Sequence, residues 1–153
     1  MSYQDTKTSK LRDYLFNVIN NLIEDRNYQI NADMLSNNID DYSLDKIPTS
    51  KSVENWITDD GLERVVYSFR SRKSYSTDTI VNLQNIGFFE DFESIIESNN
   101  KKGVLPDIDN IESIECLNPW TMLRNNDGHS AEFNIQIQIT YRRGEELENE
   151  INL

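Results

Sequence analysis

The feature of this sequence that most constrains its fold is a strict alternation of apolar and polar residues between Ala131 and Arg142. Successive side chains of a β-strand point to opposite faces of a sheet, so this run predicts a long strand with one buried face. The positions on the apolar face are Phe133, Ile135, Ile137, Ile139 and Tyr141. The positions on the polar face are Asn134, Gln136, Gln138 and Thr140. Because the polar face is nearly free of charge, we expect an exposed strand edge that can pair with a neighbouring chain.

An amphipathic helix is predicted near the beginning of the chain, from Ser9 to Glu24. Its apolar residues recur at spacings of three and four, which places them on one stripe of a helix. The hydroxyl of Thr8 or Ser9 is suited to accept from the unpaired amides of the first turn. The apolar stripe consists of Leu11, Leu15, Val18, Ile19, Leu22 and Ile23.

The stretch from Thr77 to Lys102 has the same helical spacing but contains Gly87, a residue type that can end a helix in the left-handed conformation. We therefore expect two helices, the first capped by Ser76 or Thr77 and ending at Gly87. The second helix is expected to end at Gly103. Its buried stripe is predicted to consist of Phe88, Phe89, Phe92, Ile95 and Ile96.

Several shorter strands are predicted around these helices. The segment from Tyr28 to Ala32 alternates as an edge strand does, and Tyr42 to Ile47 forms a second strand that Pro48 closes. A hairpin is expected from Val53 to Ser71 around the turn Asp59-Asp60-Gly61, where glycine can supply a positive φ. Its return strand places Val65, Tyr67 and Phe69 on the inward face.

The last two predicted strands flank a polar turn. One runs from Ile111 to Leu117 and is broken at Asn118-Pro119-Trp120, and the turn itself is Asn125-Asn126-Asp127-Gly128. Together these elements predict an α+β fold with a mostly antiparallel sheet, an N-terminal helix and two central helices packed on one face. We expect one domain over residues 1–144 and an acidic C-terminal tail over residues 145–153.

The charge balance limits the classes of partner. The net charge is −12, from 27 acidic and 15 basic residues, which argues against a surface that grips nucleic acid. Such a charge serves solubility, and a negative wall would also let a DNA duplex pass as cargo without binding. The sequence has no long apolar run and no leader-like N-terminus, so we expect no membrane partner. The single cysteine, Cys116, excludes an internal disulfide and fits a reducing cytoplasm.

The residues that could carry chemistry are few. His129 is the only histidine and is expected to be a turn residue, and Cys116 is expected to behave as a small buried hydrophobe. The segment Asp107-Ile108-Asp109-Asn110 begins like a calcium loop but lacks the later glycine and glutamate, so a polar turn is the better interpretation. No phosphate-binding loop, zinc spacing or nucleophile elbow is present. We therefore expect no catalytic, cofactor-binding or metal-binding residues, and no enzyme.

Other residues are candidates for an assembly interface. Trp56 and Trp120 stand next to turns, where a large aromatic side chain serves either the core or an interface with similar probability. Arg70, Arg72 and Lys73 form the most basic patch, which we expect to be solvated at a strand end, with a partner role as the alternative. With them we count the uncharged strand positions Asn134, Gln136 and Gln138.

The strand from Phe133 to Tyr141 and a set of positions before it match one known pattern. The other positions that match are Phe69, Ser71, Arg72, Tyr75, Asp78, Phe88, Phe89, Lys102, Gly103, Leu105, Pro106, Ile114, Glu115 and Leu117. Through these positions, about two-thirds of the chain resembles a family of small tail proteins from long-tailed phages and phage-like particles of Gram-positive bacteria. The first 50 residues and the Asn118-Pro119-Trp120 corner depart from the family pattern.

What the resemblance implies is a tail terminator, also called a tail completion protein, similar to the lambda-type terminators. Such α+β subunits form a six-membered ring on the head-proximal end of the tail tube. The implied partners are further copies of the chain, the tail tube protein, the neck or head–tail connector and, in a contractile particle, the sheath protein. The implied location is the tail–neck junction of a virion or phage-tail-like particle made in the host cytoplasm. Alternatives are another neck or head–tail connector subunit, or a small enzyme that acts through Cys116 or His129.

Overall fold

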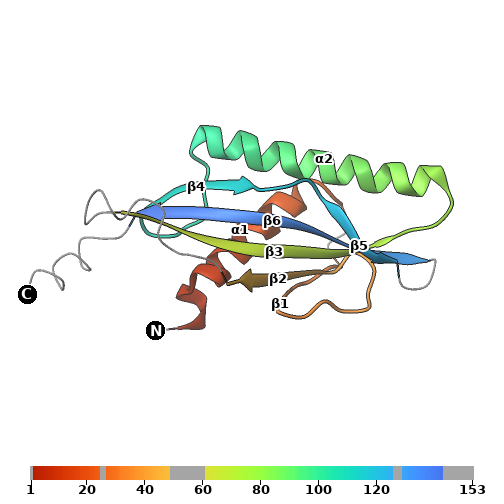
Figure 1. The fold of residues 1–153 in the computed structure, drawn as a ribbon, viewed down its shortest axis with the longest axis horizontal. Coiled ribbons are helices and arrows are strands. Elements are labelled where there is room, and N and C mark those ends of the chain that lie inside the picture. The colour runs from red at the N-terminus through yellow and green to blue at the C-terminus, as the bar shows by residue number, and fades with distance from the viewer. Residues whose placement is uncertain (1, 25–26, 49–60, 126–128, 143–153) are drawn as a thin grey trace, which may run out of the picture.

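The computed structural model describes residues 2–24, 27–48, 61–125 and 129–142, and the account below concerns those residues. They form an α+β fold with a six-stranded sheet, as the sequence predicts (Figure 1). Neither of its two α-helices is long and apolar enough to cross a membrane. In chain order the elements are η1 (Tyr3–Asp5), α1 (Lys7–Asn20), β1 (Ile30–Ala32), β2 (Tyr42–Ile47), β3 (Leu62–Ser74), α2 (Thr79–Lys102), β4 (Ile111–Cys116), β5 (Thr121–Asn125) and β6 (Ser130–Arg142).

The long antiparallel pair of β3 and β6 forms the centre of the sheet. It is in register from Leu62 opposite Arg142 to Ser74 opposite Ser130. The strand order is β1-β2-β3-β6-β4, with β5 also paired to β6, and only the β1–β2 pair is parallel. The sheet is therefore mostly antiparallel, as expected.

The expectation of a free edge along the final strand is wrong, because β6 is hydrogen-bonded on both sides. On the side away from β3, β5 pairs with its first half and β4 with its second half. The alternation identified the two faces of β6 correctly, but it carries no information about what pairs with its edges. At the outer strands β1 and β4, side chains from the helices form hydrogen bonds with backbone groups. Arg12 Nε donates to the carbonyl of Ile30 at 2.6 Å, and the amide of Ile114 donates to Asn100 Oδ1 at 2.9 Å.

The central helical region is one helix of 24 residues, not two. It begins after Asp78, whose carboxylate accepts from the amide of Ile80, and ends at Gly103 with φ +75°. Gly87 has no positive φ and lies inside the helix. A glycine in a helix interior costs about 1 kcal/mol relative to alanine, and burial of a single aromatic side chain such as Phe89 or Phe92 contributes more than that. The sheet therefore holds the helix together across Gly87.

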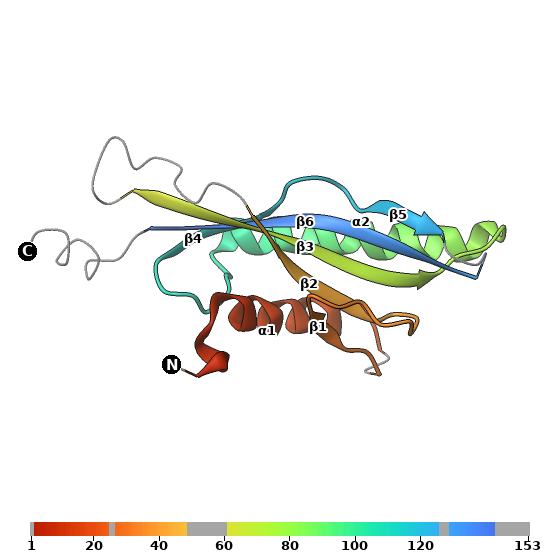
Figure 2. The same ribbon diagram turned by 60° about the horizontal axis from the view of Figure 1, so that its bottom comes forward.

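Both helices contact the same face of the sheet. Thr8 Oγ1 on α1 lies 3.1 Å from the hydroxyl of Tyr67, and the ring of Phe92 on α2 lies 5.7 Å from the ring of Phe69. Tyr67 and Phe69 are two positions apart on β3, so they share a face. Helix α2 runs lengthwise along the β3–β6 pair (Figure 1), and α1 lies beside β1 (Figure 2).

The apolar faces predicted from the sequence form the core. The inward residues of β3 and β6, the stripe residues within α1 and the aromatic side of α2 are buried, except that Tyr141 is partly buried. Leu22 and Ile23 of the predicted stripe are partly buried and lie beyond the helix, which ends at Asn20 and not at Glu24. Phe88 and Ile95 are partly buried against this core. Helix α1 is capped by Thr6 rather than by Thr8 or Ser9, which is a shift of less than one turn. The residues at the centre of the core include Leu11, Leu15, Ile19, Tyr42, Tyr67, Phe69, Phe92, Ile96, Ile114 and Ile135.

Some expectations fall on residues outside the described ranges. These are the first arm of the expected hairpin with Trp56, most of its turn, the centre of the Asn125–Gly128 turn and the acidic tail. Within the described part of the chain, the return strand of that hairpin is β3, and its described partners are β2 and β6.

Candidate functional site

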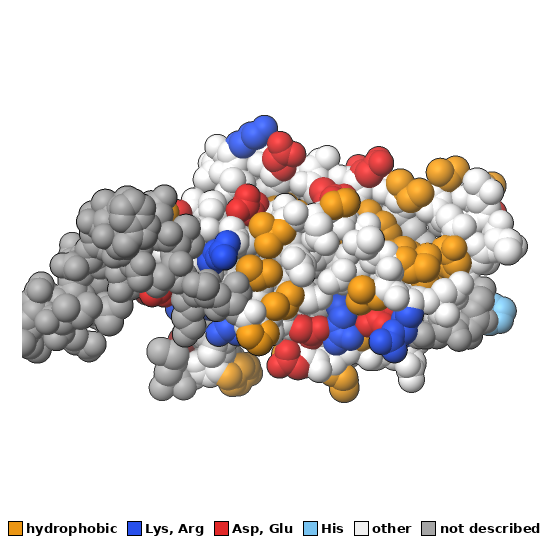
Figure 3. Space-filling view, in the orientation of Figure 1, with side chains coloured by type: hydrophobic (Ala, Val, Ile, Leu, Met, Phe, Trp, Pro, Cys, Tyr) orange, Lys and Arg blue, Asp and Glu red, His pale blue; other side chains and the backbone are white. Residues whose placement is uncertain are grey.

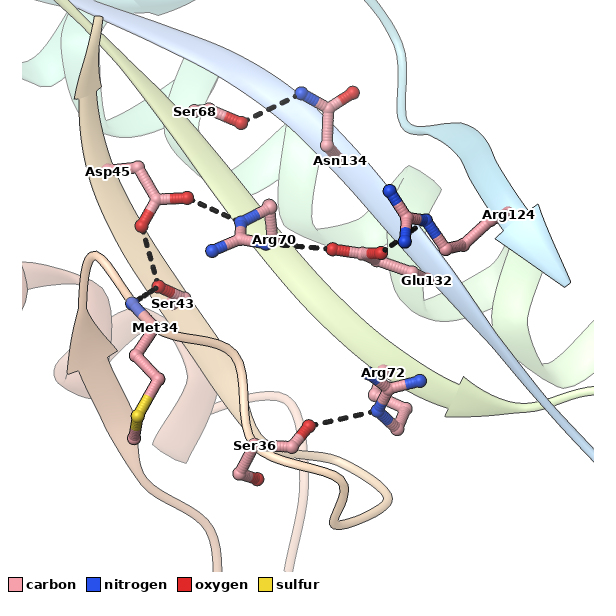
Figure 4. A network of polar contacts seen from close by, with 10 residues as sticks. All are labelled: Met34, Ser36, Ser43, Asp45, Ser68, Arg70, Arg72, Arg124, Glu132 and Asn134. Carbon is pink, nitrogen blue, oxygen red and sulfur yellow. Dashed lines mark hydrogen bonds and ion pairs between the residues drawn. The ribbon is translucent and has the colours of Figure 1, made fainter. Parts of the chain in front are cut away.

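The face of the sheet opposite the helices carries a network of charged side chains centred on Arg70 (Figure 4). Arg70 donates through Nε to Asp45 on β2 and through Nη1, at 2.9 Å, to Glu132 Oε1 on β6. Arg124 on β5 lies on the far side of Glu132, with 3.3 Å between Nε and Oε2. Three arginine and carboxylate contacts thus join four neighbouring strands.

The same network extends to the loop between β1 and β2. Ser43 Oγ donates to Asp45 Oδ1 at 2.7 Å and accepts from the amide of Met34 at 2.9 Å. Arg72 Nε donates to the carbonyl of Ser36 at 2.9 Å (Figure 4). The loop is therefore attached at two points to the sheet face that the helices leave uncovered, here called the open face. One attachment is at Ser43 on β2 and the other at Arg72 on β3.

The electrostatics of Arg70 fit a structural role. Its burial would lower the pKa of the guanidinium, but the hydrogen bonds and charges of Asp45 and Glu132 outweigh the burial and raise it. Glu132 and Arg72 are buried, Arg70 and Asp45 are partly buried, and Arg124 is exposed. The candidate interface residues Arg70 and Arg72 thus contact their own chain.

The expectation that the basic patch is solvated is wrong for Arg72 and for Lys73. Lys73 is 4% exposed, with Nζ 3.1 Å from Asp40 Oδ1 and 2.8 Å from the hydroxyl of Tyr42. The ammonium also lies 3.9 Å from the centroid of the Phe88 ring. Burial lowers the pKa of Lys73, and the charge of Asp40 offsets part of that effect. These partners are distant in sequence, which is why the local pattern did not reveal them.

The remaining described candidates are buried or partly buried in their own chain. Trp120 is 8% exposed and stacks on Phe89 with 4.8 Å between ring centroids, so the core alternative holds for it in this chain. Gln138 is buried and donates to Glu115 Oε1 at 2.7 Å, and Asn134 donates to Ser68 Oγ at 2.9 Å. Gln136 is half-buried, and its amide donates to Asn118 Oδ1 at 2.8 Å. Trp56 lies outside the described residues.

The geometry does not bring Cys116 and His129 together. Cys116 is paired with Ile137, whereas His129 precedes the first residue of β6, so roughly 25 Å of strand separates them at 3.3 Å per residue. Cys116 lines an open groove of about 500 Å³ between α2 and β4. Burial, followed by the charges of Glu93 and Glu115, raises the pKa of its thiol to about 12. A thiol in that state is a poor nucleophile at neutral pH.

Asp107 and Asp109, the acidic residues of the calcium-like segment, are exposed. Asp107 lies 3.4 Å from Lys10 Nζ, as expected for a polar turn. Among the described residues, no group of three or more histidine, cysteine, aspartate or glutamate side chains is arranged to hold a metal ion.

The surface feature that sequence reasoning missed is an apolar area on α2 and β5, here called the α2–β5 strip. Its members are exposed by 40–66% of their surface, and in Figure 3 apolar side chains gather over the first half of α2 and over β5. A sequence signal was present, because the helix from Thr79 to Phe89 contains no charged residue. The strip consists of Ile80, Leu83, Ile86, Met122 and Leu123.

The two parts of the strip are linked beneath the surface by two buried aromatic residues, Phe89 and Phe133. Ile86 and Phe89 are one helical turn apart, and the Phe89 ring lies 4.9 Å from the ring of Phe133. Phe133 is in turn the cross-strand partner of Met122. A β-bulge between Met122 and Arg124 then makes Leu123 the extra residue of β5.

The sequence matches no protein-family model, and no curated protein matches it.

Proposed function

We propose that this chain is a structural subunit of a phage tail or phage-tail-like particle, namely a tail terminator. In this role, copies of the chain form a ring, six-membered by the resemblance, on the head-proximal end of the tail tube. The ring stops further tube subunits from adding and offers a joining surface to the neck. The mechanism is geometric: one face of the ring matches the tube, and the other does not recreate the growing surface.

The observation that carries the proposal is the α2–β5 strip. Apolar side chains that gather on one part of a surface are typical of interaction sites, whereas scattered single ones are ordinary. Here the strip occurs in a chain in which 27% of residues are charged, on a helix whose first half carries no charge. An exposed apolar surface beside a polar, neutralised sheet face is typical of a subunit that is buried on assembly.

The positions that resemble the tail family support the same proposal. Phe69 on β3, Phe88 and Phe89 on α2 and the apolar face of β6 pack against one another in a single core. These matched positions form one packing unit, whereas the matched positions Asp78, Lys102, Gly103, Glu115 and Leu117 are exposed. The net charge of −12 fits a ring through which DNA passes as cargo.

Electron microscopy of particles assembled without this chain tests the proposal. Loss of a terminator gives overlong tails or tails that are not joined to heads. Loss of a head-completion or connector subunit, the second candidate, gives tails of normal length and heads that leak DNA. The second outcome would replace the terminator by the connector.

The enzyme alternative has its own test. Replacing both Cys116 and His129 with alanine should leave assembly unchanged, because neither residue belongs to the α2–β5 strip. A double variant that folds and assembles but no longer functions would favour the enzyme.

A further inference from the structure

A second set of exposed apolar residues lies at the opposite edge of the sheet from β5. In the loop between β1 and β2, residues 33–41, Met34 is 59% exposed and Ile39 is 41% exposed. Figure 4 shows Met34 on the β2 side of the open face and Arg124 on the β5 side, with β3 and β6 between them. One molecule therefore carries exposed apolar residues at two opposite edges of its sheet.

The two surfaces lie at the same height along the strands. The amide of Met34 donates to Ser43 Oγ. Ser43 lies opposite Arg70, Arg70 opposite Asn134 and Asn134 opposite Thr121 on β5, so these four residues form one row across the sheet. The loop's Asp40 donates its amide to the carbonyl of Arg72.

Arg72 belongs to the next row of this kind. It pairs with Glu132, and Glu132 pairs with Arg124. A neighbour placed edge to edge would thus bring loop and strip together without a step along the strand direction.

The charges around the two surfaces are complementary. Arg124, with 69% of its side chain exposed, is the charged residue next to the β5 part of the strip. The charged residues of the loop are all acidic; Asp33 and Asp40 are exposed, and Asp40 already contacts Lys73 within its own chain. Opposite charges beside matching apolar surfaces select a register and offset repulsion between copies of an acidic protein.

We propose that the α2–β5 strip of one copy docks against the Met34–Ile39 loop of a second copy, in a head-to-tail contact. This inference rests on the proposed role as an assembly subunit and names the partner of the strip. A head-to-tail contact repeats around a ring when its rotation closes.

Disulfide crosslinking between singly substituted chains tests the contact. In full-length protein with Cys116→Ala, one preparation carries Leu123→Cys and another carries Ile39→Cys, so each chain has one thiol. The matched control is Val104→Cys, which is 51% exposed and lies at the other end of α2. Two cysteines form a disulfide only when their Cα atoms approach within about 7 Å, which makes the readout specific.

Mild oxidation of the mixed preparations, alone and with tail tubes, is followed by mass on non-reducing gels. We expect the Leu123→Cys and Ile39→Cys mixture to give at least about tenfold more crosslinked dimer than Leu123→Cys mixed with Val104→Cys, because docking raises the effective concentration of the two thiols. Leu123→Cys that crosslinks best with itself would show a face-to-face dimer and overturn the proposal. Equal yields in all mixtures, or no crosslink with or without tubes, would overturn it as well.

The same preparations separate this inference from the proposed function. A crosslink between Leu123→Cys and Ile39→Cys in a protein that does not bind tube ends would support the head-to-tail contact and contradict the terminator role. Tube-end binding without that crosslink removes the contact and leaves the terminator. A variant with Leu83→Asp that loses tube binding but keeps the crosslink assigns the strip to the tube protein and also overturns the contact.

Discussion

The ammonium nitrogen of Lys73 lies 3.9 Å from the centroid of the Phe88 ring, which ties the end of β3 to the middle of α2. Phe88 directly follows Gly87, the residue at which a helix end was expected. A buried cation over an aromatic face contributes about 2 kcal/mol when it is desolvated. This contact and the adjacent aromatic packing thus explain why the helix continues through its weakest position.

Replacing Lys73 with methionine removes the buried charge and keeps a side chain that can pack on Phe88. Because burial lowers the pKa of Lys73 below its ordinary 10.5, the unfolded state binds more protons as the pH approaches 10.5 from below. Stability from this residue therefore rises with pH in that window. We expect the free energy of unfolding of the wild type, measured relative to Lys73→Met by urea titration, to be larger at pH 10 than at pH 8. A difference that is constant or falls with pH contradicts the burial of a charged lysine.

The two glycines of α2 should respond in opposite directions to alanine. A Cβ at Gly87 meets nothing within 4 Å and the residue has no positive φ, so Gly87→Ala should stabilise the protein by about 0.5–1 kcal/mol. Gly103 has φ +75°, and Gly103→Ala should destabilise by about 1 kcal/mol or more. Thermal unfolding of both variants checks the pair. A destabilising Gly87→Ala would support two helices in place of one.

The two sides of the Glu132–Arg124 contact should differ in their effect on stability. Glu132 has 7% of its side chain exposed and also holds Arg70, so Glu132→Gln should cost about 2 kcal/mol by leaving a half-buried guanidinium with one partner fewer. Arg124 has 69% of its side chain exposed, and Arg124→Gln should change the free energy of unfolding by less than about 0.5 kcal/mol. Equal costs in urea titrations would mean that Glu132 is not buried.

The thiol of Cys116 should be nearly inert in the folded protein. Its pKa is raised from 9.0 to about 12, so the thiolate fraction and the reaction rate with a disulfide reagent at pH 8 fall by up to about a thousandfold relative to the urea-unfolded chain. A folded protein that reacts as fast as the unfolded one argues against this burial.

The same shift makes stability depend on pH. A raised pKa stabilises the fold fully below pH 9.0, and this contribution is lost as the pH rises towards about 12. Cys116→Ala should therefore lose less stability than the wild type across that range. The measurement is the free energy of unfolding of both proteins at matched pH values, and identical slopes would contradict the prediction.

The faces of the strands and the first helix could be predicted from the sequence, because side-chain periodicity is a local property. The alternation from Phe133 to Tyr141 gave the inward side of β6, and the stripe from Leu11 to Ile19 gave that of α1. The order of the strands was not available in the same way. Whether β6 is central or at an edge depends on the pairing of β3, β4 and β5, which no local pattern encodes.

The partners of the basic patch were hidden for a similar reason. Arg70 is neutralised by Asp45 and Glu132, which are 25 and 62 positions away in the sequence, and their distance concealed the burial. By contrast, the α2–β5 strip had a local signal in the uncharged segment from Thr79 to Phe89. A helical segment without charge is equally compatible with burial and with an interface, because exposure of one helix face can be judged only once the sheet is in place.

The measurement that tests the central claim most directly is binding of the purified chain to isolated tail tubes, imaged by electron microscopy. The account predicts a ring of added density at one end of each tube, and no further elongation of the tubes that carry it. Tubes whose ends stay bare in the presence of the folded chain, or that are decorated along their length, would contradict the terminator role.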